Sequence, residues 1–179
     1  MKNITKIFAI ALVALGFSAT SFAQTVSPSS TATADATASI LTPILITKNA
    51  DLGFGTIGAV AGSASTVVVS NTGVRTSATA TLFTVASTPV TNARFTITGT
   101  PNALFAITLP ATDVSLTSTS VGATAMTIPA ASWSSDLGVS STILNTGSKV
   151  LNLGATLNVG AGQTAGTYSG SFDVTVAYN

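Results

Sequence analysis

The C-terminal segment most constrains what this chain can fold into, because its polarity alternates up to the last residue but one. One parity of this segment is apolar and consists of Phe172, Val174, Val176 and Tyr178. The other parity is small or polar and consists of Ser171, Asp173, Thr175 and Ala177. A period of two among β-branched and aromatic residues is typical of a half-buried strand. A chain end frays unless something holds it, so we expect this strand to pair with a strand of the same molecule or of another.

The same period recurs along the chain between turn residues. In residues 149–159 the apolar parity consists of Leu151, Leu153, Ala155, Leu157 and Val159. Shorter apolar runs lie at spacings near ten residues, and no helical periodicity follows residue 24. This pattern predicts an all-β fold of antiparallel strands, either a sandwich or a barrel. We expect the strands around the turn at residues 99–102 to form a hairpin. The last two strands form either a hairpin or parts of facing sheets.

A second long alternating segment lies near the N-terminus. Its apolar parity consists of Ala32, Ala34, Ala36, Ala38 and Ile40, and continues after Pro43 with Ile44 and Ile46. We expect a first strand over Thr33–Thr47 with an irregularity at Pro43, because proline cannot donate to a β-ladder. Residues 32–40 are the candidate for an edge strand or for a strand donated to another molecule.

The N-terminus predicts export. Lys2 and Lys6 precede an apolar run over residues 7–17, and small residues at Ser21 and Ala23 mark a cleavage position. We expect residues 1–23 to be a signal peptide, residues 24–31 a flexible leader, and residues 32–179 a single domain. No second apolar run is long enough to span a membrane as a helix. The expected location is the periplasm, the cell surface or the extracellular space.

Composition argues against several classes of function. After residue 23 the chain has four basic and five acidic residues, a net charge of 4 − 5 = −1, so we expect no nucleic-acid partner. Cysteine, histidine and glutamate are absent, which removes disulfides, the commonest metal ligand and the usual general base. We expect neither enzyme activity nor a cofactor. A glycine pattern at residues 53–58 resembles a dinucleotide-binding turn, but no helix pattern follows it, so we interpret it as a strand bend.

Two further sets of side chains were candidates for binding. Side-chain oxygens of the kind that bind Ca²⁺ are present at Asn49, Asp51, Asp113 and Asp136. Their positions fit residues that form turns, so we expect no metal site. Trp133, between serines, is the only tryptophan. On a loop it would serve as a platform for a sugar ring or as an interface anchor, and otherwise it belongs to the core or to a strand end.

The order of several blocks resembles a secreted bacterial family, the domain of unknown function 4402 (DUF4402) family. These blocks are residues 32–47, 52–55, 95–99, 105–110, 153–157 and 166–178. The C-terminal block is also similar to spore-coat-protein-U-like and chaperone–usher pilus subunits. It shares with them a penultimate aromatic residue, Tyr178, alternating apolar residues before it, and a glycine, Gly166, fourteenth from the end. The cysteine pair usual in pilins is missing.

This resemblance favours an immunoglobulin-like (pilin/adhesin-like) antiparallel β-sandwich as the fold. It implies a strand that a periplasmic chaperone recognises and that later takes part in assembly. The expected function is therefore a secreted, non-enzymatic structural or adhesin-like subunit of a fimbrium or similar cell-surface polymer. It would act through strand pairing, with other copies of itself as partners. The alternative is a monomeric extracellular glycan-binding β-sandwich module that uses Trp133.

Overall fold

A computed structural model describes residues 29–179. The expected signal peptide and residues 24–28 of the expected leader lie outside the described residues. All strands of the described residues belong to one compact unit, Ser39–Asn179. The start of the domain at residue 32 stays a prediction. Within residues 29–179, no helix has the length and apolar character needed to cross a membrane.

The unit is built from short strands and one long one. In chain order they are β1 (Leu45–Ala50), β2 (Gly53–Phe54), β3 (Thr56–Gly58), β4 (Ser65–Val69), β5 (Arg75–Ser77), β6 (Thr81–Phe83), β7 (Val90–Thr91), β8 (Ala93–Thr98), β9 (Leu104–Thr108), β10 (Val114–Leu116), β11 (Met126–Ile128), β12 (Ser134–Ser135), β13 (Ser140–Thr142), β14 (Ser148–Val159) and β15 (Thr175–Tyr178). A single 3₁₀ turn, η1 (Ala130–Ser132), precedes β12. The strand pairings described are all antiparallel, which confirms the predicted all-β antiparallel class. The immunoglobulin-like assignment stays a prediction.

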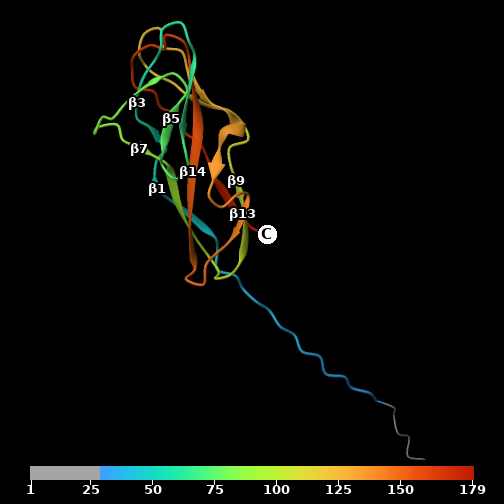
Figure 1. The fold of residues 1–179 in the computed structure, drawn as a ribbon. Helices are drawn as coiled ribbons and strands as arrows, with labels where there is room; N and C mark the ends of the chain where they lie inside the picture. The colour runs from blue at the N-terminus through green and yellow to red at the C-terminus, as the bar shows by residue number, and fades with distance from the viewer. Residues whose placement is uncertain (1–28) are drawn as a thin grey trace, which may run out of the picture. The chain divides into compact units, whose positions relative to one another are not determined.

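Strand β14 is the central strand of the larger sheet, which runs in the order β1-β8-β14-β11-β10 with β12, β4 and β5 attached beside this path (Figure 1). β14 pairs with β8 through residues 148–153 and with β4 through residues 155–159. The change of partner falls at Gly154. A β-carbon there would meet the main chain of Val69 and Ser70 and would lie 2.6 Å from the amide nitrogen of Asn71. Glycine at this position therefore permits the close approach of β4 to β14.

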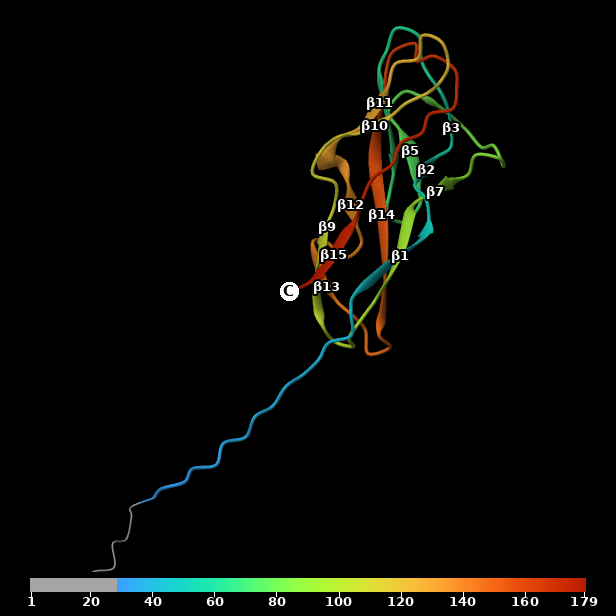
Figure 2. The same ribbon diagram turned by 180° about the vertical axis from the view of Figure 1, so that it is seen from behind.

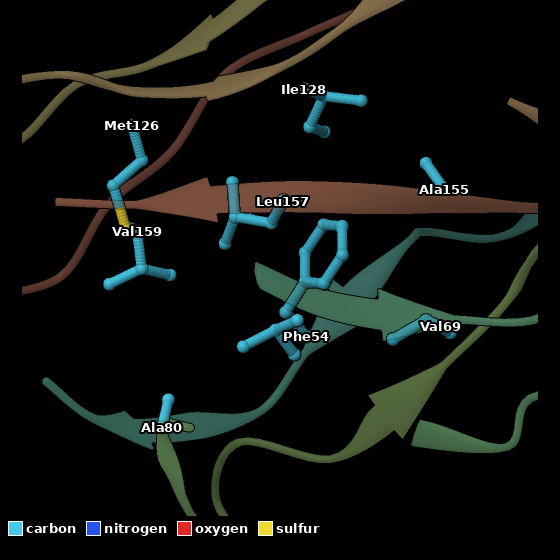
Figure 3. Packing of buried hydrophobic residues seen from close by; sticks show 9 residues of the cluster. Phe54, Val69, Ala80, Met126, Ile128, Ala155, Leu157 and Val159 are labelled. Carbon is cyan, nitrogen blue, oxygen red and sulfur yellow. The ribbon is translucent and has the colours of Figure 1, made fainter. Parts of the chain in front are cut away.

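The predicted apolar parity of β14 is confirmed, and it contributes to two core clusters. The first core cluster consists of Phe54, Val67, Val69, Ala80, Met126, Ile128, Ala155, Leu157 and Val159. Figure 3 shows these side chains gathered around Leu157 and Phe54. The second core cluster consists of Ala93, Ile97, Phe105, Ile107, Ile143, Leu151 and Leu153. Because β14 supplies residues to both clusters, it connects the two halves of the core.

The second core cluster lies between two layers. One layer contains β8 and β14, and the other is the three-stranded sheet β13-β9-β15, which both views show beside β14 (Figure 2). The expected hairpin of β8 and β9 is wrong, because β8 pairs with β1 and β14 while β9 pairs with β13 and β15. The turn at residues 99–102 instead carries the chain from one layer to the other. Of the two alternatives for the last two strands, the facing-sheet arrangement is the one found.

The expected first strand over Thr33–Thr47 is wrong for most of its length. Residues 29–44 hold no regular secondary structure, and residues 29–43 are all exposed. Regular pairing begins at Leu45, two residues after Pro43. Alternation gives a segment the pattern of a strand, but a ladder also needs a partner, and this segment has none among the described residues.

The glycine pattern at residues 53–58 is a strand bend, as interpreted from the sequence. Gly55 has a φ of 70° and separates β2 from β3. The bend is held by Arg75 of β5, whose guanidinium donates to the carbonyl oxygens of Phe54 at 2.7 Å and Thr56 at 3.1 Å. It also donates to the carbonyl oxygen of Phe83, at 2.8 Å. One side chain therefore joins β5 to three neighbouring segments.

Candidate functional site

Two edge strands, β1 and β15, contact each other where the two layers meet. Among the described residues, β1 pairs only with β8, and β15 pairs only with β9. Each strand therefore has one unpaired edge. We call this region the seam, and define it by its core-facing side chains Ile44, Ile46, Phe172, Val174, Val176 and Tyr178, all packed against the second core cluster.

The free edge of β15 exposes main-chain groups at Val176 and Tyr178. The amide of Asn179 donates to the carbonyl of Leu104 at 3.2 Å, which fixes the hydrogen-bonding parity of the β15–β9 ladder. In an antiparallel ladder the hydrogen-bonding direction alternates from residue to residue. Thr175 and Ala177 therefore bond toward β9, and the N–H and C=O groups of Val176 and Tyr178 point toward the unpaired edge.

The same parity argument applies to β1. The amide of Gly99 donates to the carbonyl of Gly147 at 3.1 Å, so the β8 residues of the same parity bond toward β14. Thr96 and Thr98 then bond toward Thr47 and Leu45 of β1. The main-chain groups of Ile46 are left on the free edge. The seam therefore offers unpaired donors and acceptors on both sides, the arrangement that an additional strand can satisfy.

The predicted alternation of the C-terminal segment is confirmed by burial. Phe172, Val174, Val176 and Tyr178 are half-buried, while the residues between them are exposed. In contrast, Ile97 and Phe105 in the middle of the same cluster are fully buried. Only Thr175–Tyr178 joins a ladder, since residues 171–174 hold no regular structure. The apolar row of the seam is therefore only partly covered. Its side chains carry no charge.

The hydroxyl of Tyr178 closes one end of the seam. It accepts from the amide of Thr100 at 2.7 Å and donates to the carbonyl of Thr42 at 2.7 Å. The amide of Thr42 in turn donates to the hydroxyl of Thr100, at 2.7 Å. The penultimate aromatic residue thus joins the C-terminal strand to the interlayer turn and to the segment before β1. Sequence reasoning expected only an apolar role for this ring, since nothing in the alternation indicates what a hydroxyl bonds.

Gly166, the other element of the C-terminal pattern, has its nearest neighbours among residues that do not define the seam. A β-carbon there would meet the hydroxyl groups of Ser118 and Ser120. Four residues later, Gly170 closely approaches the main chain of Ser115. A bridge between Thr117 and Ser169 holds these two segments side by side. The described contacts of Gly166 are therefore with the segment that follows β10.

The N-terminal candidates have no partner in the described chain. Ala34, Ala36, Ala38 and Ile40 are exposed and belong to no strand. Among the large apolar side chains of residues 29–179, Ile40 is 96% exposed and is exceeded only by Val121 at 98%.

Trp133 lies between η1 and β12 and is half-buried. It packs against the first core cluster. The centroid of its ring lies 4.4 Å from the centroid of the Phe172 ring, and the two ring planes meet at an angle of 46°. Its indole Nε1 is buried without a hydrogen-bond partner. The tryptophan therefore contributes to packing, and it brings Phe172 of the seam into contact with the other half of the core.

Two surface hollows are further candidates for a binding site. One, of about 510 Å³, is lined by Ser65, Thr66, Thr127 and Asn158 among others. The other, of about 390 Å³, is lined by Asp113, Asp173, Ser115, Ser171 and Phe172 among others. Within residues 29–179 no group of three acidic, histidine or cysteine side chains is placed to hold a metal ion.

The fold and the seam together define a two-layer, antiparallel all-β domain with an unpaired edge. The sequence model of the domain of unknown function DUF4402 matches residues 44–178. The chain therefore belongs to the DUF4402 family. No protein with a curated description and no solved structure matches it. The match begins at Ile44, so the exposed alternating segment lies before the matched region.

Proposed function

We propose that this protein is an exported, non-enzymatic structural or adhesin-like subunit that self-associates at the cell surface by β-strand pairing. The observation that carries the proposal is the coexistence of an unpaired, partly covered seam with an unpaired alternating segment. The seam needs main-chain partners and an apolar cover. Residues 32–40 have free main-chain groups and an apolar parity. Strand addition to an exposed edge is a common mode of recognition because main-chain hydrogen bonds supply affinity and side chains supply specificity.

The charges of the chain support this mode of assembly. Lys48 and Asp51 form an ion pair at 2.7 Å on the surface, and the remaining charged side chains are few and dispersed. A surface with so little charge has weak repulsion between copies. The seam itself is uncharged, so an incoming strand with an apolar inner row meets no desolvation cost from a buried charge.

The pilin-like reading belongs to the same proposal. The penultimate Tyr178, the alternating row before it and Gly166 form the pattern shared with chaperone-assembled subunits. On this reading a periplasmic chaperone would cover the seam before assembly, and the chain would carry a cleaved signal peptide. The contacts of Tyr178 give the penultimate position a physical role, since its hydroxyl holds the end of the seam closed.

The test compares the chain that begins at Gln24 with a variant that lacks residues 24–39. In the part of the deleted segment that the structure describes, residues 29–39, there is no strand. We expect the longer chain to form oligomers or fibres by analytical ultracentrifugation and electron microscopy, and the shortened chain to remain a folded monomer. A polymer that persists without residues 24–39 would overturn the donated-strand mechanism.

A length-preserving pair of variants controls for the deletion. Ala34→Asp combined with Ala36→Asp places charge on the apolar parity, whereas Thr33→Asp combined with Thr37→Asp places it on the polar parity. We expect the first pair to abolish association and the second to reduce it far less. Equal loss in both would indicate that added charge, and not strand pairing, controls association.

A second candidate is the glycan-binding module, now centred on the hollow beside Phe172. Asp113 and Asp173 supply acceptors for sugar hydroxyls, Phe172 supplies an apolar surface, and the volume of about 390 Å³ suits one small sugar. Binding on a glycan array that is lost in Asp173→Ala and kept in Asp51→Ala would favour this function. Asp51 is a suitable control because it lies outside the hollow.

A further inference from the structure

Ile40 is an apolar side chain held in solvent. It is 96% exposed, and Leu41 beside it is 50% exposed. An isolated surface leucine or isoleucine is ordinary. Two adjacent exposed apolar side chains on a segment without regular structure are less common, and neither of these two belongs to a core cluster or is among the side chains packed against one.

The chain two residues further on is fixed. Thr42 donates from its amide to the hydroxyl of Thr100 at 2.7 Å, and its carbonyl accepts from the hydroxyl of Tyr178 at 2.7 Å. Pro43 follows, and its ring restricts the backbone further. The backbone close to Ile40 is therefore held in place. Because of this, Ile40 loses less conformational freedom on binding than a side chain on a freely moving tail would lose.

The apolar parity of the segment contains a single large side chain. Ala32, Ala34, Ala36 and Ala38 are alike in size and shape, and only Ile40 differs. A uniform row of alanines specifies register poorly, because a slip by two residues presents the same surface. One bulky residue removes this degeneracy, since it fits only where the receiving surface has space for it.

We propose that Ile40 is the anchor that seats residues 32–40 of one copy in the seam of a second copy and fixes their register. The side chain would enter between Ile46 of β1 on one side and Val174 and Val176 on the other, of which only Val176 lies in β15. All three side chains are half-buried and therefore incompletely covered. The alanines would pack against the remaining side chains of the seam. Those side chains are large and already fill the space, so only a small side chain fits over them. This inference rests on the proposed strand pairing.

The test exploits the opposite parities of two adjacent residues. In the chain from Gln24, Ile40→Ala should weaken association about tenfold or more, the effect typical of removing a central buried anchor. Leu41→Ala should change the association constant less than about threefold, as expected of a peripheral contact. Sedimentation over a range of concentrations measures both. An equal effect of the two substitutions would overturn the anchor and indicate non-specific apolar association.

The failure of this inference can be told apart from that of the proposed function. If Ile40→Ala leaves association unchanged while deletion of residues 24–39 abolishes it, the anchor is wrong and strand donation stands. If neither change affects association, both are wrong. Because the chain has no cysteine, Ile40→Cys and Val176→Cys chains with different tags can be mixed and oxidised. We expect a disulfide between the two chains. Closure only within a single chain that carries both cysteines would overturn the second-copy assignment.

Discussion

Gly154 is the residue on which the path of β14 most depends. Its α-carbon lies where β4 replaces β8 as partner, against the main chain of Val69 and Ser70. We predict that Gly154→Ala lowers the free energy of unfolding by about 1–3 kcal/mol, the range for overpacking, because main-chain atoms cannot move aside as a flexible side chain can. Urea denaturation measures the change.

Gly160, just after β14, is the matched control. A β-carbon there would meet only the amide oxygen of Gln163, at the far end of a flexible side chain. Gly160→Ala should change the free energy of unfolding by less than about 0.5 kcal/mol, as is usual for surface substitutions. Similar losses for the two alanines would show that the close approach at Gly154 does not determine stability.

Arg75 gives a second prediction at this scale. Its three main-chain hydrogen bonds join β5 to the β2–β3 bend and to β6. We expect Arg75→Met to lower the free energy of unfolding by roughly 2–4 kcal/mol, because hydrogen bonds to charged groups contribute more than neutral ones and the carbonyls lose their donor. Arg75→Lys should recover only part, since an ammonium lacks the planar fork. Thermal and urea unfolding measure both variants.

Arg94 is the control for Arg75, because it is exposed on β8. Arg94→Met should leave stability nearly unchanged. If Arg75→Lys proved as stable as the original chain, the fork geometry would be irrelevant.

The sequence predicts which side chains are buried, but it does not predict the partners of side-chain hydrogen bonds. The parities of residues 151–159 and 172–178 predicted which side chains face the core, since a period of two fixes sides. The partners of Arg75 and the Tyr178 hydroxyl are main-chain groups up to 136 positions away, and no local pattern encodes such distances. Trp133 packs on the first core cluster and against the ring of Phe172, and its role as a ligand platform stays a prediction.

Among the elements, β15 and the segment before β1 are joined through one hydroxyl. We predict that Tyr178→Phe keeps the ring packing but lowers the free energy of unfolding by about 1–2 kcal/mol, through loss of the contacts with Thr100 and Thr42. Amide hydrogen exchange at Thr100 should become faster, because its donor is left without a protein acceptor.

Tyr168→Phe is the matched control for this element. The hydroxyl of Tyr168 accepts from Gln163 and donates to the carbonyl of Thr164, and neither partner is a residue of the seam. It should destabilise the chain while leaving exchange at Thr100 near its original rate relative to global unfolding. Unchanged exchange at Thr100 in Tyr178→Phe would contradict the role of this hydroxyl.

The wrong predictions of a β8–β9 hairpin and of a long first strand share one cause. Strand pattern and turn residues at 99–102 suit a hairpin and an interlayer turn equally well, because both need a reversal of direction. The partner is decided by β1 and β14, which occupy both edges of β8. Likewise, residues 33–44 carry a strand pattern without a strand, since pairing depends on a neighbour that alternation does not supply.

For the whole molecule, the sharing of β14 between two core clusters predicts cooperative unfolding. The side chain of Trp133 packs on the first cluster and its ring contacts Phe172, which packs on the second. We expect a single transition in urea, with coincident midpoints by tryptophan fluorescence and far-ultraviolet circular dichroism. Two separated transitions would show that the halves of the core unfold independently.

The three hydrogen bonds that Arg75 donates have a consequence for the order in which the chain opens. They join β5 to the bend between β2 and β3 and to β6, so these segments separate only when all three bonds are broken. We therefore expect the bend to open together with β5 and β6 as one cooperative unit, and not as an independent loop.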